Sequence, residues 1–341
     1  MGFRRKCEGK LLIAAKAVTN TLTILISSHN RAGLLDRTLR YLNEARRPRD
    51  WSVDTLVAAN ACTDGTHTLL DLYACAASDS ATQRGRLPLR WVAEPRMGKS
   101  HALNCAIPLL NSERVAFVDD DHRVDGGYLE SICRAAQAYP EADILCGRIL
   151  PDWNGSEPAW IHDNGPYRIY PLPIPRYDLG DSPLASPHET TTPGGGNLVL
   201  RTALFDRVGD FSTVYGPVGR GLGGAEDHEW VLRAIAAGAR LQYVPDIVQY
   251  HYVDPMRLKL GYLVRKAYER SASAVRLGGT GNGKGLVPAY MIRKAGEYSL
   301  AVLTSVAPQE RRFHLVRLAA SLGEINGYVR ARMDESAQTR S

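Results

Sequence analysis

The sequence predicts an α/β protein in which a doubly wound, mostly parallel sheet is flanked by helices and followed by a basic helical extension. In the first half of the chain, apolar β-rich runs alternate with segments of helical periodicity, which is typical of a parallel sheet. Small polar and acidic residues gather where these runs end, at the edge where such sheets bind ligands. Residues 255–341 carry 15 Lys and Arg against 6 Asp and Glu, whereas the preceding residues carry 27 against 30. This uneven charge suggests two parts with different partners.

Strand and helix signals follow one another through the first 121 residues. The apolar residues after the first strand recur at helical spacing, as Leu35, Leu39 and Leu42 show. The expected strands and helices, in chain order, are the strands Thr21–Ser28, Val53–Ala58, 89–95 and 114–121 and the helices 30–45, 66–79 and 98–111.

The second half of the chain is less regular. The segment Pro151–Pro193 is rich in Pro, Gly, Asp and Tyr, and loops of this length usually have a function, so we expect it to select the acceptor. Strand and helix signals return before His251, and basic helical segments follow Pro255. We therefore expect three parts, which are an N-terminal tail at 1–20, a catalytic domain at 21–253 and a basic helical extension at 254–341.

Composition excludes several classes of protein. The six cysteines are scattered without CxxC spacing, which favours buried thiols in a reducing compartment over a disulfide framework or a zinc site. Lys16 interrupts the apolar N-terminal stretch and no apolar run reaches 18 residues, so we expect neither a signal peptide nor a transmembrane helix. No zinc-finger, RNP-like or helix-turn-helix pattern accompanies the basic residues, so no nucleic acid partner is expected. A cytoplasmic location follows.

Two glycine motifs fail as phosphate-binding loops. The segment MGKS has Ala93 where a P-loop needs its first glycine. The segment GRGLGG, at 219–224, follows no convincing strand and has no βαβ context. The sequence therefore predicts neither a P-loop nor a dinucleotide site.

Three consecutive carboxylates, Asp119, Asp120 and Asp121, follow the buried run Val115–Val118 directly. Residues separated by one position point to the same side of a strand, so Asp119 and Asp121 can converge on one hard cation. Magnesium and manganese favour such oxygen ligands and commonly join them to substrate phosphates. The alternative is an exposed acidic turn without a ligand.

Six segments occur in the order that is typical of family 2 glycosyltransferases, and the chain resembles that family from about Thr21 to Tyr252. The segments are TILISSHNRAGLLDRTLRYL, VAANACTDGT, EPRMGKSHALNCAI, FVDDDHRVDGGYL, GGGNLVLRTALFDRVGDF and GAEDHEWVLRAIAAGARLQYVPDIVQYH. The resemblance implies a GT-A fold and an inverting enzyme that depends on a nucleotide sugar.

The resemblance also implies a donor pocket. Its residues are Ser27, Ser28, Asn30, Arg31, Asn60, Lys99, Asp119 and Asn197. Many relatives carry two acidic residues where this chain has Ala59 and Asn60. Asn60 is therefore expected to contact the base of the nucleotide, while the identity of that base is left open. Lys99 is expected to reach the diphosphate, with a solvated lysine as the alternative. Asn197 follows glycines that a tight turn would explain equally well.

By the same resemblance, Asp227 is the general base and Glu226 holds the base or the acceptor in place. Acids at a helix start can also be purely structural, because the helix dipole favours them there. Asp121, Asp119 and His251 are the expected ligands of Mg²⁺ or Mn²⁺, and a buried hydrogen-bonded histidine is the alternative for His251. His122 stands where relatives often have another acid. It is expected either to support the metal ligands or to be a surface histidine.

The expected reaction moves a sugar from a nucleotide-diphosphate sugar, with a UDP-sugar favoured, to a hydroxyl of a lipid-linked or polysaccharide glycan. The basic segments 255–277 and 311–332 are expected either to touch the inner face of the cell membrane or to pack on the catalytic domain or a second subunit. One alternative is a nucleotidyltransferase of similar fold, which needs a glycine-rich basic loop that SSHNRAGLL lacks. The other is an inactive glycan-binding scaffold, which would hydrolyse no donor in the presence of metal.

Overall fold

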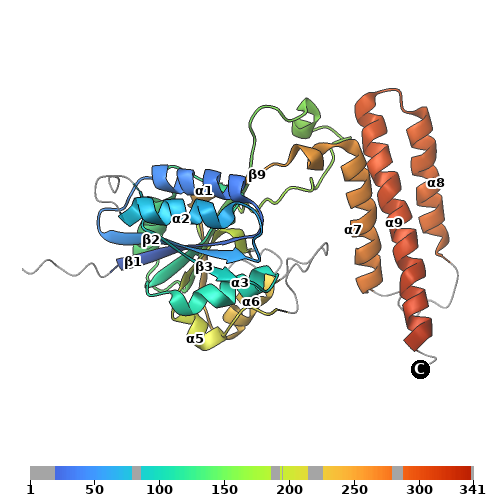
Figure 1. The fold of residues 1–341 in the computed structure, drawn as a ribbon. Coiled ribbons are helices and arrows are strands. Elements are labelled where there is room, and N and C mark those ends of the chain that lie inside the picture. Colours follow the sequence, from blue (N-terminus) through green and yellow to red (C-terminus); the bar gives the residue numbers. More distant parts are fainter. Residues whose placement is uncertain are drawn as a thin grey trace, which may run out of the picture. The chain divides into compact units, whose positions relative to one another are not determined.

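The structure, a computed structural model, describes residues 20–78, 86–185, 193, 195–213, 226–278 and 287–338. The predicted tail at 1–20 lies outside the described residues except for Asn20, where the first strand begins. The described residues form two compact units (Figure 1). The first holds the residues up to Leu150 together with Tyr177–His251, and the second holds Pro151–Arg176 together with the residues from Tyr252 onward.

The first unit is built on one mixed β-sheet. Among the described residues this sheet has nine strands, of which eight run in the order β3-β2-β1-β4-β8-β6-β9-β5, while β7 pairs with β9. The strands are β1 (Asn20–Ser28), β2 (Trp51–Asn60), β3 (Leu89–Glu94), β4 (Arg114–Phe117), β5 (His122–Val124), β6 (Ile144–Asp152), β7 (Leu184–Ala185), β8 (Leu198–Arg201) and β9 (Leu241–Tyr252).

Strands from the first half of the chain pair in parallel, β1 with both β2 and β4, and β2 with β3. Antiparallel pairs join β4 to β8, β6 to β8, β5 to β9 and β7 to β9. Because parallel strands bring their carboxyl ends to one edge, the residues that follow β1, β2 and β4 meet there. The predicted α/β sheet is confirmed. Most of its antiparallel strands come from the second half of the chain, where the alternation of strand and helix signals is weaker.

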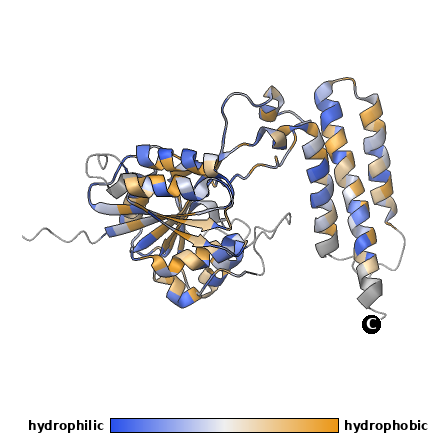
Figure 2. Ribbon diagram, viewed as in Figure 1, coloured by the Kyte–Doolittle hydropathy of each residue, from blue (hydrophilic) through white to orange (hydrophobic). Residues whose placement is uncertain are grey.

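Helices cover both faces of the sheet (Figure 1). One hydrophobic cluster joins Leu22, Ile24 and Ile26 of β1 to α1, α2 and α4, and a second joins Leu25 and Leu56 to α3, α5 and α6. Figure 2 shows that the strands are mainly apolar, whereas the helices carry both apolar and polar residues. The helices are α1 (Ala32–Glu44), α2 (Thr66–Ser78), α3 (Lys99–Ala106), α4 (Tyr128–Ala138), α5 (Leu204–Val208) and α6 (Glu226–Ala236), with 3-10 turns η1 (Ile107–Leu109) and η4 (Gly195–Asn197).

The second unit is mainly helical, which confirms the predicted helical C-terminal region. A small apolar cluster of Ile174, Val253 and Leu258 packs with Trp153 and ties the segment Pro151–Arg176 to this unit. The segment therefore groups with the extension, although the sequence predicts it inside the domain at 21–253. The elements are η2 (Ala159–His162), η5 (Pro255–Leu258), α7 (Leu260–Gly278), α8 (Ala289–Thr304) and α9 (Pro308–Gln338).

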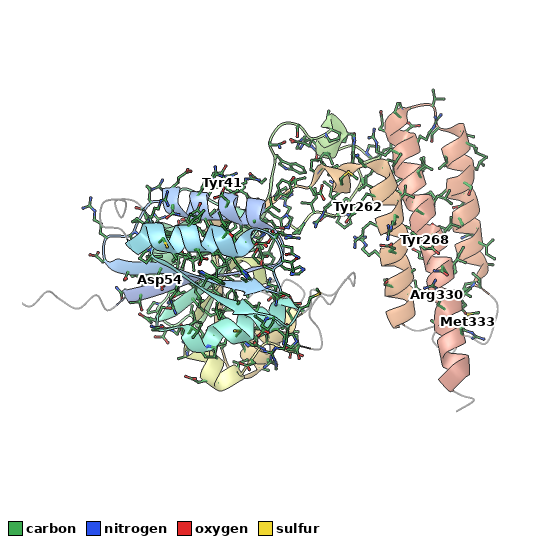
Figure 3. The ribbon with its side chains drawn as sticks, in the orientation of Figure 1. Tyr41, Asp54, Tyr262, Tyr268, Arg330 and Met333 are labelled. Atoms are coloured by element: carbon green, nitrogen blue, oxygen red, sulfur yellow. The ribbon has the colours of Figure 1, made fainter. Side chains whose placement is uncertain are left out.

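Helix α9 packs against both α7 and α8 (Figure 1). A Cβ at Gly323 or Gly327 would collide with the backbone of Tyr268 or Ala272 on α7, so these glycines permit the close approach of the two helices; Tyr268 is labelled in Figure 3. On the other side, Lys294 Nζ lies 2.9 Å from both carboxylate oxygens of Glu324, which joins α8 to α9. Among the described residues, none of the helices combines the length and the apolar character needed to cross a bilayer.

Candidate active site

Charged side chains converge at the edge of the sheet where the parallel strands β1, β2 and β4 end. A lysine bridge lies at its centre, where Lys99 Nζ donates to Asp119 Oδ1 at 2.9 Å and to Asp227 Oδ2 at 3.2 Å. Lys99 begins α3, Asp119 follows the end of β4, and Asp227 lies at the start of α6. Lys99 and Asp227 are more than 100 positions apart in the chain. The structure thus brings together the predicted base and two predicted donor-site residues.

The bridge favours the charged forms of Lys99 and Asp119. Burial alone would lower the pKa of Lys99, but the fields of Asp119 and Asp227 outweigh it and raise that pKa well above its ordinary value. Burial would likewise raise the pKa of Asp119, but Lys99 reverses the effect and lowers it strongly. One ammonium group therefore neutralises two carboxylates that would otherwise repel each other.

Asn60 positions the turn that carries Lys99. Its Oδ1 accepts from the Gly98 amide at 2.8 Å, and its Nδ2 donates to the Arg96 carbonyl at 2.6 Å. Gly98 has a φ of 135°, a conformation that strongly favours glycine. The amide of Asn60 is thus engaged by the backbone of this turn, so the structure shows a positioning contact where the sequence predicts a contact to the base.

The middle carboxylate, Asp120, points away from the lysine bridge. Its two oxygens accept from Ser28 Oγ at 2.7 Å and from Arg31 Nη1 at 3.0 Å, and the same Arg31 nitrogen lies 2.9 Å from Asp121 Oδ2. Burial raises the pKa of Asp120 in spite of Arg31. Ser28 and Arg31, which are predicted to line the nucleotide pocket, therefore also relieve the crowding of the carboxylate triplet.

A group of possible metal ligands lies beside this bridge. One ligand atom each from Asp121, His122 and His251 lies within 4.8 Å of the others. Nε2 of His251 is 3.7 Å from Asp121 Oδ2, and Nε2 of His122 is 3.8 Å from oxygens of both Asp119 and Asp121. The antiparallel register of β5 and β9 pairs His122 with His251, and directly opposed residues in such a pair project to the same face.

Hydrogen bonds determine which nitrogen of His122 carries the proton. Gln249 Nε2 donates to the Phe117 carbonyl at 2.9 Å, a group that can only accept, so the amide orientation of Gln249 is defined. Its Oε1 therefore accepts from His122 Nδ1, 2.5 Å away. In the neutral form of this imidazole the lone pair is then on Nε2, which is buried and has no hydrogen-bond partner among the described residues.

This arrangement fits a metal ion. A buried nitrogen lone pair without a partner is costly unless it meets a donor or a cation, and here it faces two carboxylates and a second imidazole. The mixed nitrogen and oxygen set suits Mn²⁺ better than Mg²⁺, which prefers oxygen ligands. His122 is thus buried rather than on the surface.

Asn197 supports this group from behind. It is 1% exposed, its Oδ1 accepts from Gln249 Nε2 at 3.0 Å, and its Nδ2 donates to the carbonyls of Arg148 and Ile247 at 2.8 and 3.0 Å. These contacts occupy the amide, so the structure does not present Asn197 to a ligand. A polar Gln249 within a buried strand, two residues before His251, is the signal that could have revealed this support.

The remaining predicted residues lie around the site. Asn30 Oδ1 accepts from the amides of Thr63 and Asp64 at 2.7 and 3.2 Å and so holds the loop after β2. Ser27 is half-buried near the end of β1. Glu226 is 1% exposed, and burial together with Asp227 raises its pKa. Its Oε2 has no partner among the described residues.

Two glycines in the turn before β8 let the backbone approach the carboxylates of Asp227 and Asp119. A Cβ at Gly195 would overlap the carboxylate of Asp227, and a Cβ at Gly196 would lie 2.9 Å from Asp119 Oδ2 and 2.8 Å from a ring carbon of His122. Both contacts are closer than real Cβ atoms tolerate. Glycine is therefore required here by contact with the site rather than by a turn.

We expect Gly195→Ala to displace Asp227 and to lower the turnover of the enzyme by about tenfold or more, since misplacement of about 1 Å can cost about a hundredfold. Gly65→Ala is the matched control, because nothing lies within 4 Å of its Cβ position. Donor turnover by both variants, compared at equal folded fraction, checks this. Wild-type turnover in the folded Gly195→Ala protein would show that the contact does not position Asp227.

Comparison with known proteins identifies a family. The family model described as Glycosyl transferase family 2 matches residues 23–208, which is more than half of the chain. A search of curated proteins finds no match.

Solved structures of low sequence identity resemble this chain in fold. S. aureus TarS 1–349 in complex with UDP aligns with a TM-score of 0.50 at 16% identity, over 94% of this chain and 92% of that chain. The longer S. aureus TarS structure aligns with the same TM-score and identity over 90% of this chain and 55% of that chain. The mannosyltransferase PcManGT from Pyrobaculum calidifontis, in complex with GDP-Man and Mn²⁺, aligns with a TM-score of 0.49 at 18% identity over 93% and 75%.

The family match and the fold therefore define a glycosyltransferase with a GT-A fold. The chain belongs to glycosyl transferase family 2.

Proposed function

We propose that this enzyme transfers a sugar from a nucleotide-diphosphate sugar to a hydroxyl acceptor, with inversion and with Mn²⁺ as its metal. The observation that carries the proposal is the lysine bridge between Asp119 and Asp227, which lies beside the imidazole and carboxylate group of Asp121, His122 and His251. A base and a set of metal ligands at one sheet edge are the parts that an inverting displacement on a diphosphate donor requires.

Asp227 is the proposed general base. It takes the proton from the acceptor hydroxyl as that oxygen attacks the anomeric carbon, and a single displacement inverts that centre. In the structure Asp227 is held by Lys99. A donor diphosphate would compete with both carboxylates for this ammonium group, so donor binding would leave Asp227 free to accept a proton. Glu226, the neighbour of Asp227 at the start of α6, would hold the acceptor or the base in place.

The metal would be held by Asp121, His122 and His251, with Asp119 as a further oxygen ligand. When bound, it would neutralise the charge that develops on the diphosphate leaving group. Gln249 keeps the Nε2 lone pair of His122 directed at this position, and Asn197 keeps Gln249 in place. Such supporting contacts typically alter metal affinity by about 10–100-fold.

A UDP-sugar is the proposed donor. A solved TarS structure of the same fold is in complex with UDP, which supports this choice. Ser27, Ser28, Asn30 and Arg31 would border the nucleotide. The proposed acceptor is a lipid-linked or polysaccharide glycan, reached from a cytoplasmic location. The proposed catalytic domain, at 21–253, carries out the transfer. The extension at 254–341 is proposed to contact the membrane through residues 255–277 and 311–332.

Nucleotide release tests the proposed function. We expect the enzyme with Mn²⁺ to release UDP from at least one UDP-sugar, through transfer or slow hydrolysis, and to release none when EDTA is present. A nucleotidyltransferase would instead release pyrophosphate from a nucleoside triphosphate and a sugar phosphate. No release from any nucleotide-diphosphate sugar would support an inactive glycan-binding scaffold.

A further inference from the structure

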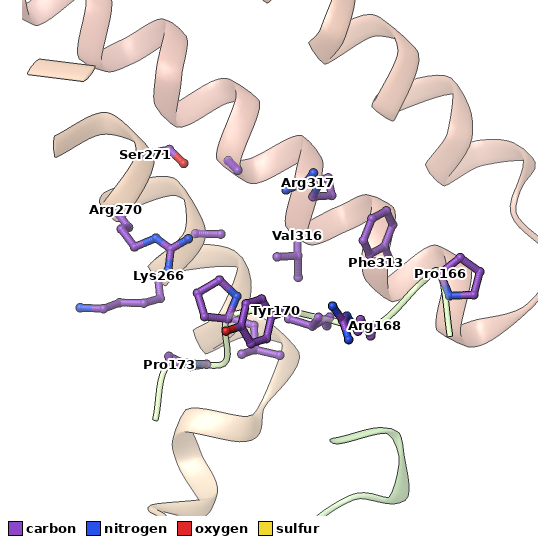
Figure 4. Close-up of a pocket in the computed structure, with 15 residues that line it drawn as sticks. Pro166, Arg168, Tyr170, Pro173, Lys266, Arg270, Ser271, Phe313, Val316 and Arg317 are labelled. Carbon is purple, nitrogen blue, oxygen red and sulfur yellow. The ribbon is translucent and has the colours of Figure 1, made fainter. Parts of the chain in front are cut away.

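The helical unit contains a cavity that the proposed transfer reaction does not use. The segment 166–173 lies across α7 and α9 and encloses, with them, a volume of about 370 Å³ (Figure 4). Every residue that lines it belongs to the second unit, so the cavity is a feature of that unit alone.

Four cations line this cavity. Lys266 and Arg270 come from α7, Arg317 from α9 and Arg168 from the crossing segment, as Figure 4 shows. The lining contains no Asp or Glu. Within the described part of the chain, none of the four cations has an ion pair with a carboxylate. Like charges gathered around one space repel one another, and a bound anion would relieve that repulsion.

Some other cations of the same unit are paired with carboxylates, unlike these four. Arg265, also on α7, lies 2.7 Å from Glu269, and Lys294 of α8 lies 2.9 Å from Glu324 of α9. Arg317 instead lies over the ring of Phe313, with its guanidinium carbon 5.6 Å from the ring centre. Arg168 lies similarly over Tyr170 at 5.4 Å. These aromatic contacts favour particular positions of both guanidinium groups without cancelling their charge.

The rest of the lining is apolar. Tyr170, Pro173, Phe313 and Val316 line the same cavity as the cations, as Figure 4 shows, and Leu263 lines it from α7. Tyr170 is 74% exposed, although leaving a large aromatic side chain in water is unfavourable. A ligand that fits such a lining combines a strongly anionic group with a hydrocarbon part.

We propose that this cavity binds a lipid phosphate, with its phosphate between the four cations and the start of its hydrocarbon chain against Tyr170, Phe313 and Val316. Guanidinium groups bind phosphate with paired, charge-assisted hydrogen bonds. A doubly charged phosphate monoester matches four cations better than a single carboxylate does. A free phosphate would leave the apolar lining in water, so the lining favours the lipid. The proposal is independent of the donor chemistry at the sheet edge.

Calorimetry of the full chain with decyl phosphate, below its micelle concentration, tests the proposal. We expect decyl phosphate to bind at least about tenfold more tightly than inorganic phosphate and than uncharged decyl maltoside, and to weaken as salt is raised. The double variant Lys266→Gln/Arg270→Gln should weaken binding by about tenfold or more. Arg293→Gln/Arg330→Gln removes the same charge from exposed positions outside the cavity and should leave binding unchanged.

Several results would overturn the proposal. Equal affinity for inorganic phosphate and decyl phosphate would exclude a lipid as the ligand. Tighter binding of polyphosphate than of decyl phosphate would indicate a phosphorylated polymer instead. Equal weakening in the two double variants would show a general charge effect rather than a site. If Lys266→Gln/Arg270→Gln loses helical circular dichroism, Arg317→Gln replaces it, and unchanged binding by that folded variant contradicts the assignment. UDP release reports separately on the donor site.

Discussion

Replacing Asp227 by Asn is expected to lower kcat by about 10²–10⁴-fold while donor binding is retained, because the amide cannot accept the acceptor proton. Asn keeps the shape of the side chain, which Gly195 contacts closely, so the change removes the basic oxygen without opening the site. Lys99 would keep its contact with Asp119 at 2.9 Å. The measurements are steady-state transfer rates and the dissociation constant of UDP in the presence of Mn²⁺.

Asp206→Asn is the matched control for Asp227→Asn, since Asp206 is an exposed carboxylate on α5 of the same unit. It should leave both the transfer rate and donor affinity unchanged. Transfer at the wild-type rate by Asp227→Asn would show that another group accepts the proton. A loss of UDP binding equal to the loss of rate would show instead that Asp227 holds the donor.

Replacing Asp121 by Ala is expected to abolish Mn²⁺ binding and, with it, turnover. Asp121 is the carboxylate within reach of both His122 and His251, so its loss leaves the two imidazoles without a negative charge from that position. Two imidazoles without that carboxylate hold a hard cation weakly. The electron paramagnetic resonance signal of free Mn²⁺, titrated against the protein, measures this binding without reference to activity.

Asp246→Ala provides the comparison for the metal measurement, because Asp246 is an exposed carboxylate on β9, the strand that also carries His251. It should bind Mn²⁺ as the wild type does. The Asp121→Ala protein also loses its ion pair with Arg31, so a thermal melt must show that it is folded. Mn²⁺ affinity that is unchanged in the folded Asp121→Ala variant would place the metal elsewhere.

The sequence anticipates the fold and the convergence of the principal charged residues. Apolar runs that alternate with helical periodicity predict the strands β1 to β4 and their helices, since burial and period follow directly from residue type. Because those strands are parallel, residues after their carboxyl ends can be expected to meet, as Lys99 and Asp119 do. Local pattern and topology together are sufficient for this part of the site.

Other parts of the site depend on tertiary contacts that no local pattern contains. The pairing of His122 with His251 follows from the register of β5 and β9, which are separated by more than 100 residues. Asn60 and Asn197 resemble ligand-binding residues in the sequence, but their amides are engaged by the backbone around Lys99 and by Gln249. A polar side chain near a site can hold the ligand or hold the protein, and residue type alone does not distinguish the two.

The boundary between the two units is also a tertiary property. Pro151–Arg176 lacks a regular period, so nothing in its sequence indicates its packing partner. The apolar contacts of Trp153, Ile161 and Leu172 with Val253 and Leu258 place it with the helical unit. The cationic cavity follows from this packing, because Arg168 and Tyr170 reach α7 and α9 only through it.

Binding of UDP measured by calorimetry with Mn²⁺ and with EDTA tests most directly whether the carboxylates and imidazoles at the sheet edge form one metal-dependent donor site. We expect UDP to bind at least about tenfold more tightly with Mn²⁺ than with EDTA, and this difference to disappear in the folded Asp121→Ala variant. Equal UDP affinity with and without Mn²⁺ in the wild-type protein would contradict a metal-dependent donor site.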